Sequence, residues 1–418
     1  MITSLVDVAI IGGGPAGLAA AIKAREAGAE NVTVIERSEA PGGLLEQCMH
    51  NGFGLFYFRE DLTGPEFAQR FIEKASDVGV NLELETMVLR VTPERMIRGC
   101  NKKGMFEIQA KAVVLAMGCR ERTREALMIP GTRPAGIFTA GTAQRYVNVE
   151  GFIPGREIVI LGSGDVGMIM ARRLTLEGAE VKAVVEALPY VGGLIRNEVQ
   201  CLADFDIPIL LGHTVTEIFG SQRVEGVAVA KADGDFNQVP GTQRTIPCDT
   251  LLVSVGLIPE NELSRAAGVR LNPLTGGPFV DESRETNIPG IFAAGNVTHV
   301  HDLVDNVVGE GELAGVGAAE FATGKGKIGR PIELKPGKNI RYVVPQKVTG
   351  EKDVVLYMRV KEPAERVSVT VGGILRKSFR FVKPSEMVQI EVPAEEWSRI
   401  DPQTCELEVR CEARRAKT

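Results

Sequence analysis

Three glycines near the start of the chain, Gly12, Gly14 and Gly17, have the spacing GxGxxG, and the acid Glu36 follows them. In such a turn the first glycine makes the tight bend, the second lets backbone approach a pyrophosphate, and the third lets a helix pack on a strand. The helix N-terminus offers free N–H groups and partial positive charge to the phosphates. A carboxylate at the end of the next strand accepts hydrogen bonds from a ribose. The pattern predicts a dinucleotide-binding site; the alternative is a Rossmann-like unit without a ligand.

The same pattern returns 150 residues later, from Gly12 to Gly162 (162 − 12 = 150). Gly162, Gly164 and Gly167 again have the spacing GxGxxG, and Glu186 takes the place of Glu36. Self-similarity at a fixed offset indicates a duplicated structural unit. We therefore predict a second dinucleotide site, against the alternative that the fold was reused without a second ligand.

The elements that must position these turns read as buried parallel strands and crossing helices. Apolar, β-branched runs precede both turns, and further buried strands are predicted at 112–118 and from residue 250. The alternation over 81–108 indicates a small antiparallel layer. Beyond about Lys335, short alternating strands predict a separate antiparallel β domain, for which a sandwich is one arrangement. The predicted fold class is α/β, with two Rossmann-like domains, one inserted in the other, and a small C-terminal antiparallel β domain.

Composition excludes several other classes of protein. The 418 residues carry a net charge of −6 with both signs mixed, so no basic stripe indicates nucleic acid or an anionic membrane. No apolar run is long enough to span a membrane, and the first apolar run leads straight into the glycine turn rather than to a signal-peptide cleavage site. The seven cysteines form no C-x-x-C or C-x4-C pair. We expect a reduced, cytoplasmic chain without a disulfide or zinc framework.

Two groups of residues outside the glycine turns have types suited to chemistry. Cys48, with His50 nearby, is the candidate catalytic residue: with a lowered pKa it would be a single redox cysteine that cycles through sulfenic acid. The favoured alternative is a small residue packed near the cofactor. His299 and His301, with Asp302 and Asp305, offer metal-ligand types, but we interpret them as a hydrated loop and predict no metal.

Five motifs in order carry a family resemblance: GGGPAGL with Glu36, VVLAMG, GSGDVG with Glu186, TLLVSVGLIPEN and IPGIFAAGN. Over residues 5–325 the chain resembles the flavoproteins with two dinucleotide-binding domains, which include thioredoxin reductase and NADH oxidase. AMGCRERTREALMIPGTRPAGIFTAGTAQ is similar to the FAD/NAD subunit of heteromeric dehydrogenases and oxidases acting on opines, glycine, proline or sarcosine, among them opine oxidase, hydrogen cyanide synthase and proline dehydrogenase. QCMHNGFGLFYFREDLTGPEF resembles companions of glycerol-3-phosphate dehydrogenase-like flavoproteins, including NADH oxidase subunits.

The resemblance implies FAD on the first unit and NAD(H) on the second. It places FAD binding in residues 1–125 and 265–330, NAD(H) binding in 126–264 and the β domain in 335–418. Asn296 stands where the family usually has Asp, and an amide still hydrogen-bonds a ribityl hydroxyl. The residues implied for FAD are Gly12, Gly14, Pro15, Ala16, Gly17, Glu36, Arg37, Gly43, Gln47, Ala116, Gly118, Gly295, Asn296, Asn306 and Val307. Those implied for NAD are Gly162, Gly164, Asp165, Val166, Gly167, Glu186 and Gly256.

The predicted function is an FAD-dependent NADH:acceptor oxidoreductase. Because the chain lacks both the cysteine pair of the disulfide reductases and the cysteine-rich iron–sulfur tail that the narrower family often carries, electrons must leave to another acceptor. We expect a hetero-oligomer with a second flavoprotein or an iron–sulfur or cysteine-rich subunit. The alternatives are a stand-alone, peroxide-forming NADH oxidase and a non-catalytic electron-transfer or scaffold subunit.

Overall fold

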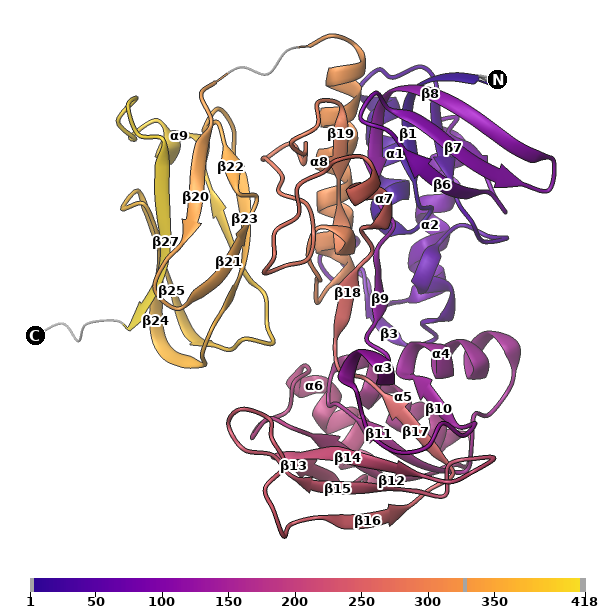
Figure 1. Cartoon of the computed structure of the whole chain (residues 1–418). Helices are drawn as coiled ribbons and strands as arrows, with labels where there is room; N and C mark the ends of the chain where they lie inside the picture. Colours follow the sequence, from indigo (N-terminus) through magenta and orange to yellow (C-terminus); the bar gives the residue numbers. More distant parts are fainter. Residues whose placement is uncertain (1–3, 326–328, 414–418) are drawn as a thin grey trace, which may run out of the picture. The chain divides into compact units, whose positions relative to one another are not determined.

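The computed structural model describes residues 4–325 and 329–413 (Figure 1). The chain divides into two compact units, one of residues 1–119 and 259–418 and the other of residues 120–258. The second unit is therefore inserted into the first. The chain passes from one unit to the other at two short strands, β9 Cys119–Glu121 and β18 Leu257–Pro259.

The first unit is built on a sheet whose parallel strands carry the first glycine turn. Its order is β5-β2-β1-β8-β7-β6, and β19 also pairs with β8. Strands β5, β2, β1, β8 and β19 run parallel, whereas β6, β7 and β8 form an antiparallel meander. This confirms the antiparallel layer predicted for 81–108 from residue 87 on, whereas residues 81–83 form β5 and run parallel to β2. The carboxyl ends of the parallel strands meet at one edge of the sheet, where the turn lies. The bounds are β1 Ser4–Ile11, β2 Val32–Ile35, β5 Asn81–Glu83, β6 Met87–Val91, β7 Met96–Asn101, β8 Gly104–Leu115 and β19 Ile291–Ala293.

Two helices, α1 (Pro15–Glu26) and α8 (Val304–Ala322), pack together on one side of this sheet (Figure 1). Their backbones approach closely because α8 presents glycines: a Cβ at Gly311 would lie 2.3 Å from the Ala16 carbonyl oxygen, and one at Gly315 2.2 Å from that of Ala20. A third helix, α2 (Gly64–Asp77), begins with a capping box between Thr63 and Glu66. Shorter elements are the 3-10 turn η1 Gly43–Gln47, β3 Asn51–Phe53, β4 Leu62–Thr63 and α7 Glu262–Ala266.

The second unit repeats this plan. Its parallel sheet has the order β10-β17-β11-β12-β13, and a separate antiparallel sheet has the order β14-β15-β16. Helix α5 (Asp165–Leu176) follows β11 as α1 follows β1. The bounds are β10 Ile137–Thr139, α4 Ala140–Arg145, β11 Glu157–Leu161, β12 Glu180–Glu186, β13 Ile209–Leu211, β14 His213–Phe219, β15 Gly226–Lys231, β16 Arg244–Pro247 and β17 Thr250–Val253; α3 Arg124–Leu127 and α6 Ile195–Asn197 are short helices.

The C-terminal part of the first unit is a β sandwich with its own core. One sheet has the order β22-β20-β27-β24-β25 and the other β21-β23-β26. Apolar side chains of both sheets and Trp397 form a separate cluster. The pairing is antiparallel, as predicted, except that β20 and β27 run parallel. The bounds are β20 Ile332–Pro336, β21 Ile340–Val344, β22 Lys347–Val348, β23 Val354–Val360, β24 Ala364–Val371, β25 Leu375–Val382, β26 Val388–Val392, α9 Ala394–Trp397 and β27 Glu406–Ala413.

Candidate dinucleotide sites

The first glycine turn lies between β1 and α1. Gly12 has a φ of +108°, and a Cβ there would lie 2.4 Å from the Ala116 carbonyl oxygen, so only glycine fits. Gly14 differs, because the nearest atom to an added Cβ is the Gly43 Cα at 3.9 Å. No side chain caps the N-terminus of α1. The backbone at Gly14 is thus open to close approach, and the first N–H groups of α1 suit a phosphate.

Glu36 is held in place beside this turn. Its side chain is buried, Oε2 accepts the Gly13 N–H at 2.7 Å, and Oε1 accepts the Ser38 N–H at 2.8 Å. Each carboxylate oxygen has further acceptor capacity, which a ribose hydroxyl can use. The carboxylate is therefore oriented by backbone before any ligand arrives.

Most of the other residues predicted for FAD gather around the same turn. A Cβ at Gly295 would lie 2.8 Å from Cβ of Ala16 and 3.1 Å from Cγ1 of Val307, so the loop after β19 contacts α1 and the first turn of α8. Pro15 begins α1, Gly118 follows β8, and Asn306 lies in the first turn of α8. Arg37 is exposed just beyond Glu36, whereas Gln47 is buried at the end of η1. The roles of all these residues in binding remain predictions.

Asn296 has its side chain fixed from the loop that follows it. Its Oδ1 accepts the His301 N–H at 3.0 Å, and its Nδ2 lies 3.6 Å from Sγ of Cys119. Because a backbone N–H can only donate, this contact assigns the amide oxygen and leaves the NH2 group on the other side. Asn296 therefore presents a donor where the family's usual Asp would present an acceptor.

The second turn, between β11 and α5, repeats these contacts. A Cβ at Gly162 would lie 2.0 Å from the Ser254 carbonyl oxygen, whereas one at Gly164 would meet nothing nearer than 3.8 Å. Glu186 is buried. Its Oε2 accepts both the N–H of Ser163, at 2.8 Å, and the hydroxyl of Ser163, at 2.6 Å. Oε1 of Glu186 accepts the Leu188 N–H at 2.9 Å. No side chain caps α5. Gly167 packs on Gly162, Val166 lies in the first turn of α5, and Gly256 follows β17.

Sequence reasoning missed a second pair of glycines that closes over this turn. The Gly192 N–H donates to Oγ of Ser163 at 2.8 Å, and the Gly193 N–H donates to its carbonyl oxygen at 3.0 Å. In the first unit the Gly42 N–H donates to the Gly13 carbonyl at 2.8 Å, as the Gly193 N–H does to that of Ser163. The pairs Gly42–Gly43 and Gly192–Gly193 are again 150 residues apart (192 − 42 = 150), so extending the repeat would have found this loop.

The Asp165 side chain accepts hydrogen bonds from within the protein. Its Oδ1 accepts the Leu194 N–H at 2.8 Å and Nδ2 of Asn197 at 2.6 Å. The side chain therefore holds the closing loop on α5. The NAD contact predicted for Asp165 stays a prediction.

Cys48 lies in an environment opposite to that of a redox thiolate. The side chain is 7% exposed, and its thiol donates to the Leu44 carbonyl at 3.3 Å. Burial raises the pKa of the Cys48 thiol to about 12. A redox cysteine needs a lowered pKa, so the geometry supports the packed residue.

The interpretation of His299 and His301 as a hydrated loop is wrong. Both rings are buried, at 1% and 0% side-chain exposure, and their Nε2 atoms lie 3.1 and 3.2 Å from the carboxylate of Glu310 on α8. The interpretation did not consider the C-terminal domain. Tyr342 and Tyr357 of that domain pack against His299. A hydrophilic sequence is no guide to exposure where a later domain covers it.

Glu310 is the centre of this buried cluster. It also accepts the N–H of Gly295 and the hydroxyl of Thr298, both at 2.9 Å, and Nε of Arg284 lies 3.1 Å away. Burial alone would raise the pKa of Glu310, but Arg284 and the two histidines outweigh it and hold the pKa well below its ordinary value. Burial and the neighbouring His301 lower the pKa of His299 to about 4, so this ring is neutral at pH 7.

His299, His301 and Glu310 could geometrically hold a metal ion. Arg284 already balances the charge of Glu310, so a divalent cation would add two uncompensated positive charges in a buried place. The cation would also compete with the Gly295 N–H and the Thr298 hydroxyl, which donate to the Glu310 carboxylate. The charge balance supports the prediction of no metal, which metal analysis must test.

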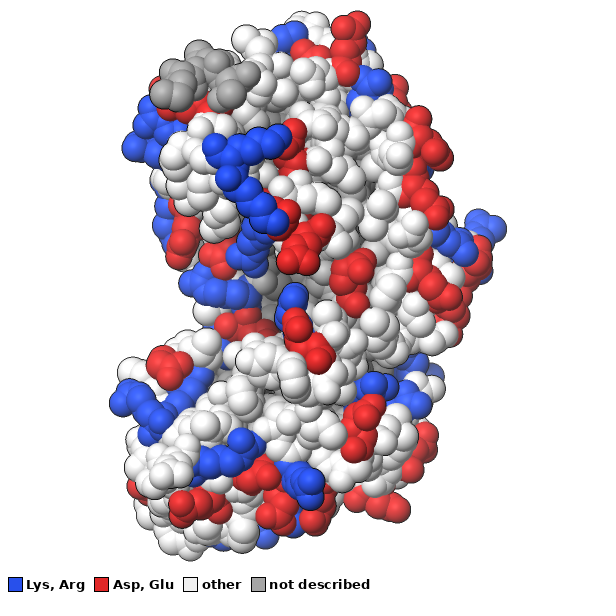
Figure 2. Space-filling view, turned by 90° about the vertical axis from the view of Figure 1, so that its right-hand side faces the viewer, with Lys and Arg blue, Asp and Glu red and all other residues white. Residues whose placement is uncertain are grey.

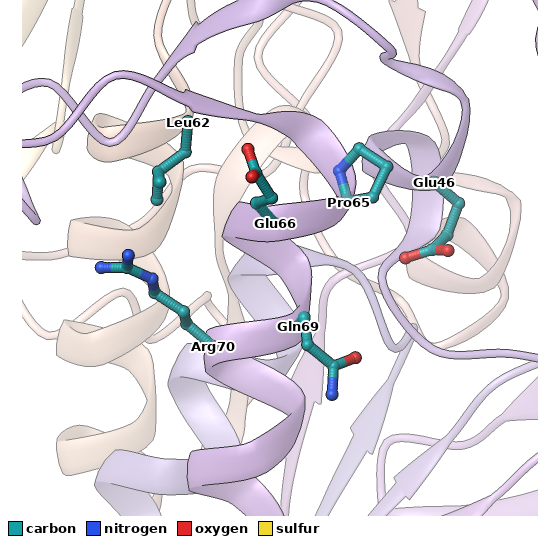
Figure 3. A pocket seen from close by; sticks show the side chains of 6 residues that line it. All are labelled: Glu46, Leu62, Pro65, Glu66, Gln69 and Arg70. Carbon is teal, nitrogen blue, oxygen red and sulfur yellow. The ribbon is translucent and has the colours of Figure 1, made fainter.

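A surface depression of about 510 Å³ lies beside the start of α2 (Figure 3). Its lining residues are Glu46, Leu62, Pro65, Glu66, Gln69 and Arg70. Glu66 caps the helix and Arg70 pairs with Glu60, so two of its three charged side chains already have partners. This depression shares no residue with the glycine turns, and we assign it no chemistry.

Figure 2 shows acidic and basic side chains interspersed over the face drawn. Within residues 4–325 and 329–413, no helix is long and apolar enough to cross a membrane.

Two glycine turns of the same design, each with a buried acid, define a flavoprotein fold with two dinucleotide-binding domains. The chain belongs to the pyridine nucleotide-disulphide oxidoreductase family, whose model matches residues 6–325. Members of this family are FAD-dependent oxidoreductases that use NAD(P)H, so the predicted FAD, a nicotinamide dinucleotide as second cofactor and the predicted fold class are confirmed. The predicted choice of NAD(H) over NADP(H) stays a prediction.

The known relatives include opine oxidase subunits and thioredoxin reductases. The chain is 28% identical to one of the opine oxidase subunits of Agrobacterium tumefaciens (strain Ach5) over 71% of its length and 62% of the relative's. It is 29% identical to thioredoxin reductase of Mycolicibacterium smegmatis over 75% and 96% of the two chains. The crystal structure of T. acidophilum thioredoxin reductase aligns with a TM-score of 0.62 at 25% identity, covering 76% and 98% of the two chains. The chain thus spans about three-fifths of the length of the opine oxidase subunit that it matches.

Proposed function

We propose that the chain is an NADH:acceptor oxidoreductase that binds FAD at the Gly12–Gly17 turn and NADH at the Gly162–Gly167 turn. The observation that supports it most is the repetition of one hydrogen-bond pattern around Glu36 and Glu186. When bound, FAD accepts a hydride from the nicotinamide and releases electrons to an acceptor. The protein's own groups bind and align the two dinucleotides.

The roles of the residues follow from their contacts. The N-termini of α1 and α5 would each hold a pyrophosphate. Glu36 and Glu186 would accept hydrogen bonds from the two adenosine riboses, and Asn296 would donate to FAD. Cys48, buried and protonated, has no part in the proposed reaction.

A partner subunit is the proposed destination of the electrons. The sequence has no C-x-x-C or C-x4-C pair to carry them onward. One relative is named as a subunit of opine oxidase, which supports a heteromeric enzyme. Its substrate and partner are properties of that longer protein, and the acceptor of this chain is open to experiment.

Two matched variants test the two sites. A Cβ at Gly14 or at Gly164 would meet no atom nearer than 3.8 Å, so the Cβ of Gly14→Val or Gly164→Val enters without a clash and the γ-methyl groups lie at a helix N-terminus. Gly14→Val should purify with much less FAD. Gly164→Val should keep FAD, which dithionite still reduces, but lose rapid reduction by NADH in stopped-flow absorbance.

The wild-type chain separates the competing functions. Anaerobic bleaching of the flavin by NADH excludes a scaffold role, and slow re-oxidation in air that a co-expressed genomic neighbour accelerates supports the partner. Fast re-oxidation by air alone supports the stand-alone oxidase. If both valine variants retain FAD and react with NADH like the wild type, the two-site assignment is wrong.

A further inference from the structure

The C-terminal β domain is hydrogen-bonded to residues 300–302, which follow Asn296, the proposed FAD contact. Arg359 of β23 donates through Nη2 to the carboxylate of Asp302 and, at 3.3 Å, to the Val300 carbonyl. The Met387 N–H, just before β26, donates to the other Asp302 oxygen at 2.6 Å. Both flanks of His301 are therefore tied to the β domain.

His301 passes this constraint to Asn296. Its backbone N–H donates to Oδ1 of Asn296 at 3.0 Å. If residues 300–302 move, the His301 N–H moves with them. The Asn296 side chain then loses the hydrogen bond that fixes the position of its oxygen and, with it, that of its NH2 group. The path from Arg359 to Asn296 contains only hydrogen bonds and one short piece of backbone.

The opposite side of the loop is fixed by α8. Glu310 accepts the N–H of Gly295 and the hydroxyl of Thr298, and its carboxylate faces both histidine rings. Tyr357 of β23 stacks edge-on against His301 with ring centroids 5.1 Å apart. The loop 295–302 is thus clamped between a helix of the dinucleotide-binding fold and a strand of the added domain.

We propose that Arg359 and Asp302 are positioning residues, through which the β domain sets the orientation of Asn296 and thereby the affinity for FAD. This inference rests on the proposed contact between Asn296 and FAD. The family model ends at residue 325, so the relevant strand lies outside the part that the family shares. The β domain would then have a role in cofactor binding besides any part in docking a partner.

A double-mutant cycle on the full-length protein tests the coupling. The variants are Arg359→Met, Asn296→Ala and the double change, and the measured quantity is the FAD dissociation constant after removal and titrated return of the flavin. Loss of one positioned hydrogen bond corresponds to a decrease in affinity of about threefold to tenfold. We expect this loss in each single variant and no further loss when Arg359→Met is added to Asn296→Ala.

Controls separate positioning from folding. Arg410→Met removes an exposed arginine that pairs with Glu408 on β27 of the same domain and should leave FAD affinity unchanged. Asp302→Asn keeps the shape of the side chain and an acceptor for Met387 while losing the ion pair, and serves if Arg359→Met does not fold. Arg359→Lys should restore part of the affinity and the wild-type visible circular dichroism of the flavin.

The outcomes are distinct. Additive effects in the cycle overturn the positioning role. The same follows if FAD affinity stays within twofold of the wild type in both Arg359→Met and Asp302→Asn. An unchanged affinity in Asn296→Ala shows instead that the proposed FAD contact of Asn296 is wrong. Failure of the wild-type chain to bind FAD at all refutes the proposed function itself.

Discussion

His299 makes the stability of the first unit depend on pH in a definite direction. Its ring is buried, and its pKa is lowered from 6.5 to about 4. The unfolded chain therefore binds a proton at His299 below about pH 6.5, which the folded chain takes up only near pH 4. A depressed folded pKa gives stability that is fully present above pH 6.5 and is lost as the pH falls toward 4.

The magnitude follows from the size of the shift. One pKa unit corresponds to about 1.36 kcal/mol, so the full shift is worth about 3 kcal/mol. The free energy of unfolding should fall by up to about 1.4 kcal/mol per pH unit through this window. Glu310, whose pKa is also lowered, adds its own loss below its ordinary value of 4.5, so the interval from pH 6.5 to 4.5 lies above the loss from Glu310.

Urea unfolding of the wild type and of His299→Gln across this interval measures the effect. Trp397 is the single tryptophan and is buried in the β domain, whose tyrosines cover His299, so its fluorescence reports the relevant unfolding. Glutamine does not titrate, so the variant should lose about 2–3 kcal/mol less than the wild type between pH 6.5 and 4.5. Lys335→Gln, a surface change on β20, should leave the wild-type slope. Equal slopes in the wild type and His299→Gln would refute the argument, since His299 would then bind its proton equally in both states.

Three further predictions concern the dinucleotide sites. Gly12→Ala should abolish FAD retention and lower the melting temperature, because its Cβ meets the Ala116 carbonyl at 2.4 Å; Gly28→Ala, with a similar φ of +100° but no neighbour within 4 Å, separates backbone strain from that clash. Cys48→Ser should leave flavin reduction by NADH within about twofold in stopped-flow measurements, since a buried thiol with a pKa of about 12 is protonated; a collapse of oxidative turnover would restore the redox role. Glu186→Gln should lower the preference of kcat/KM for NADH over NADPH by up to about tenfold, the equivalent of 1.4 kcal/mol, because it removes a charge that repels a 2′-phosphate. Glu180→Gln, at the exposed start of the same strand, is the matched control, and an equal effect of the two changes argues against a contact at Glu186.

The sequence by itself determined the two glycine turns, because their requirements are local. A Cβ at Gly12 or Gly162 strikes the backbone of the adjacent strand's end, and no other residue type relieves that clash. The acid at the end of the second strand is likewise fixed by the length of one strand–helix–strand unit. The same offset of 150 residues relates Gly192 and Gly193 to Gly42 and Gly43. The hydrogen bonds to Ser163 show that these glycines form a loop over the second turn.

Only the tertiary structure decided the environment of side chains that distant segments cover. Cys48 lies beside the start of α2, where a Cβ at Gly64 would be 2.7 Å from Cβ of Cys48, yet burial raises the pKa of its thiol. That burial is a property of the packing around η1 and α2. His299 and His301 look like a polar loop in sequence, yet residues more than forty positions later enclose them. Burial and charge balance depend on which segments meet across the fold, so no local pattern contains them. The role that we propose for the β domain at the loop 295–302 rests on the same kind of contact between distant segments.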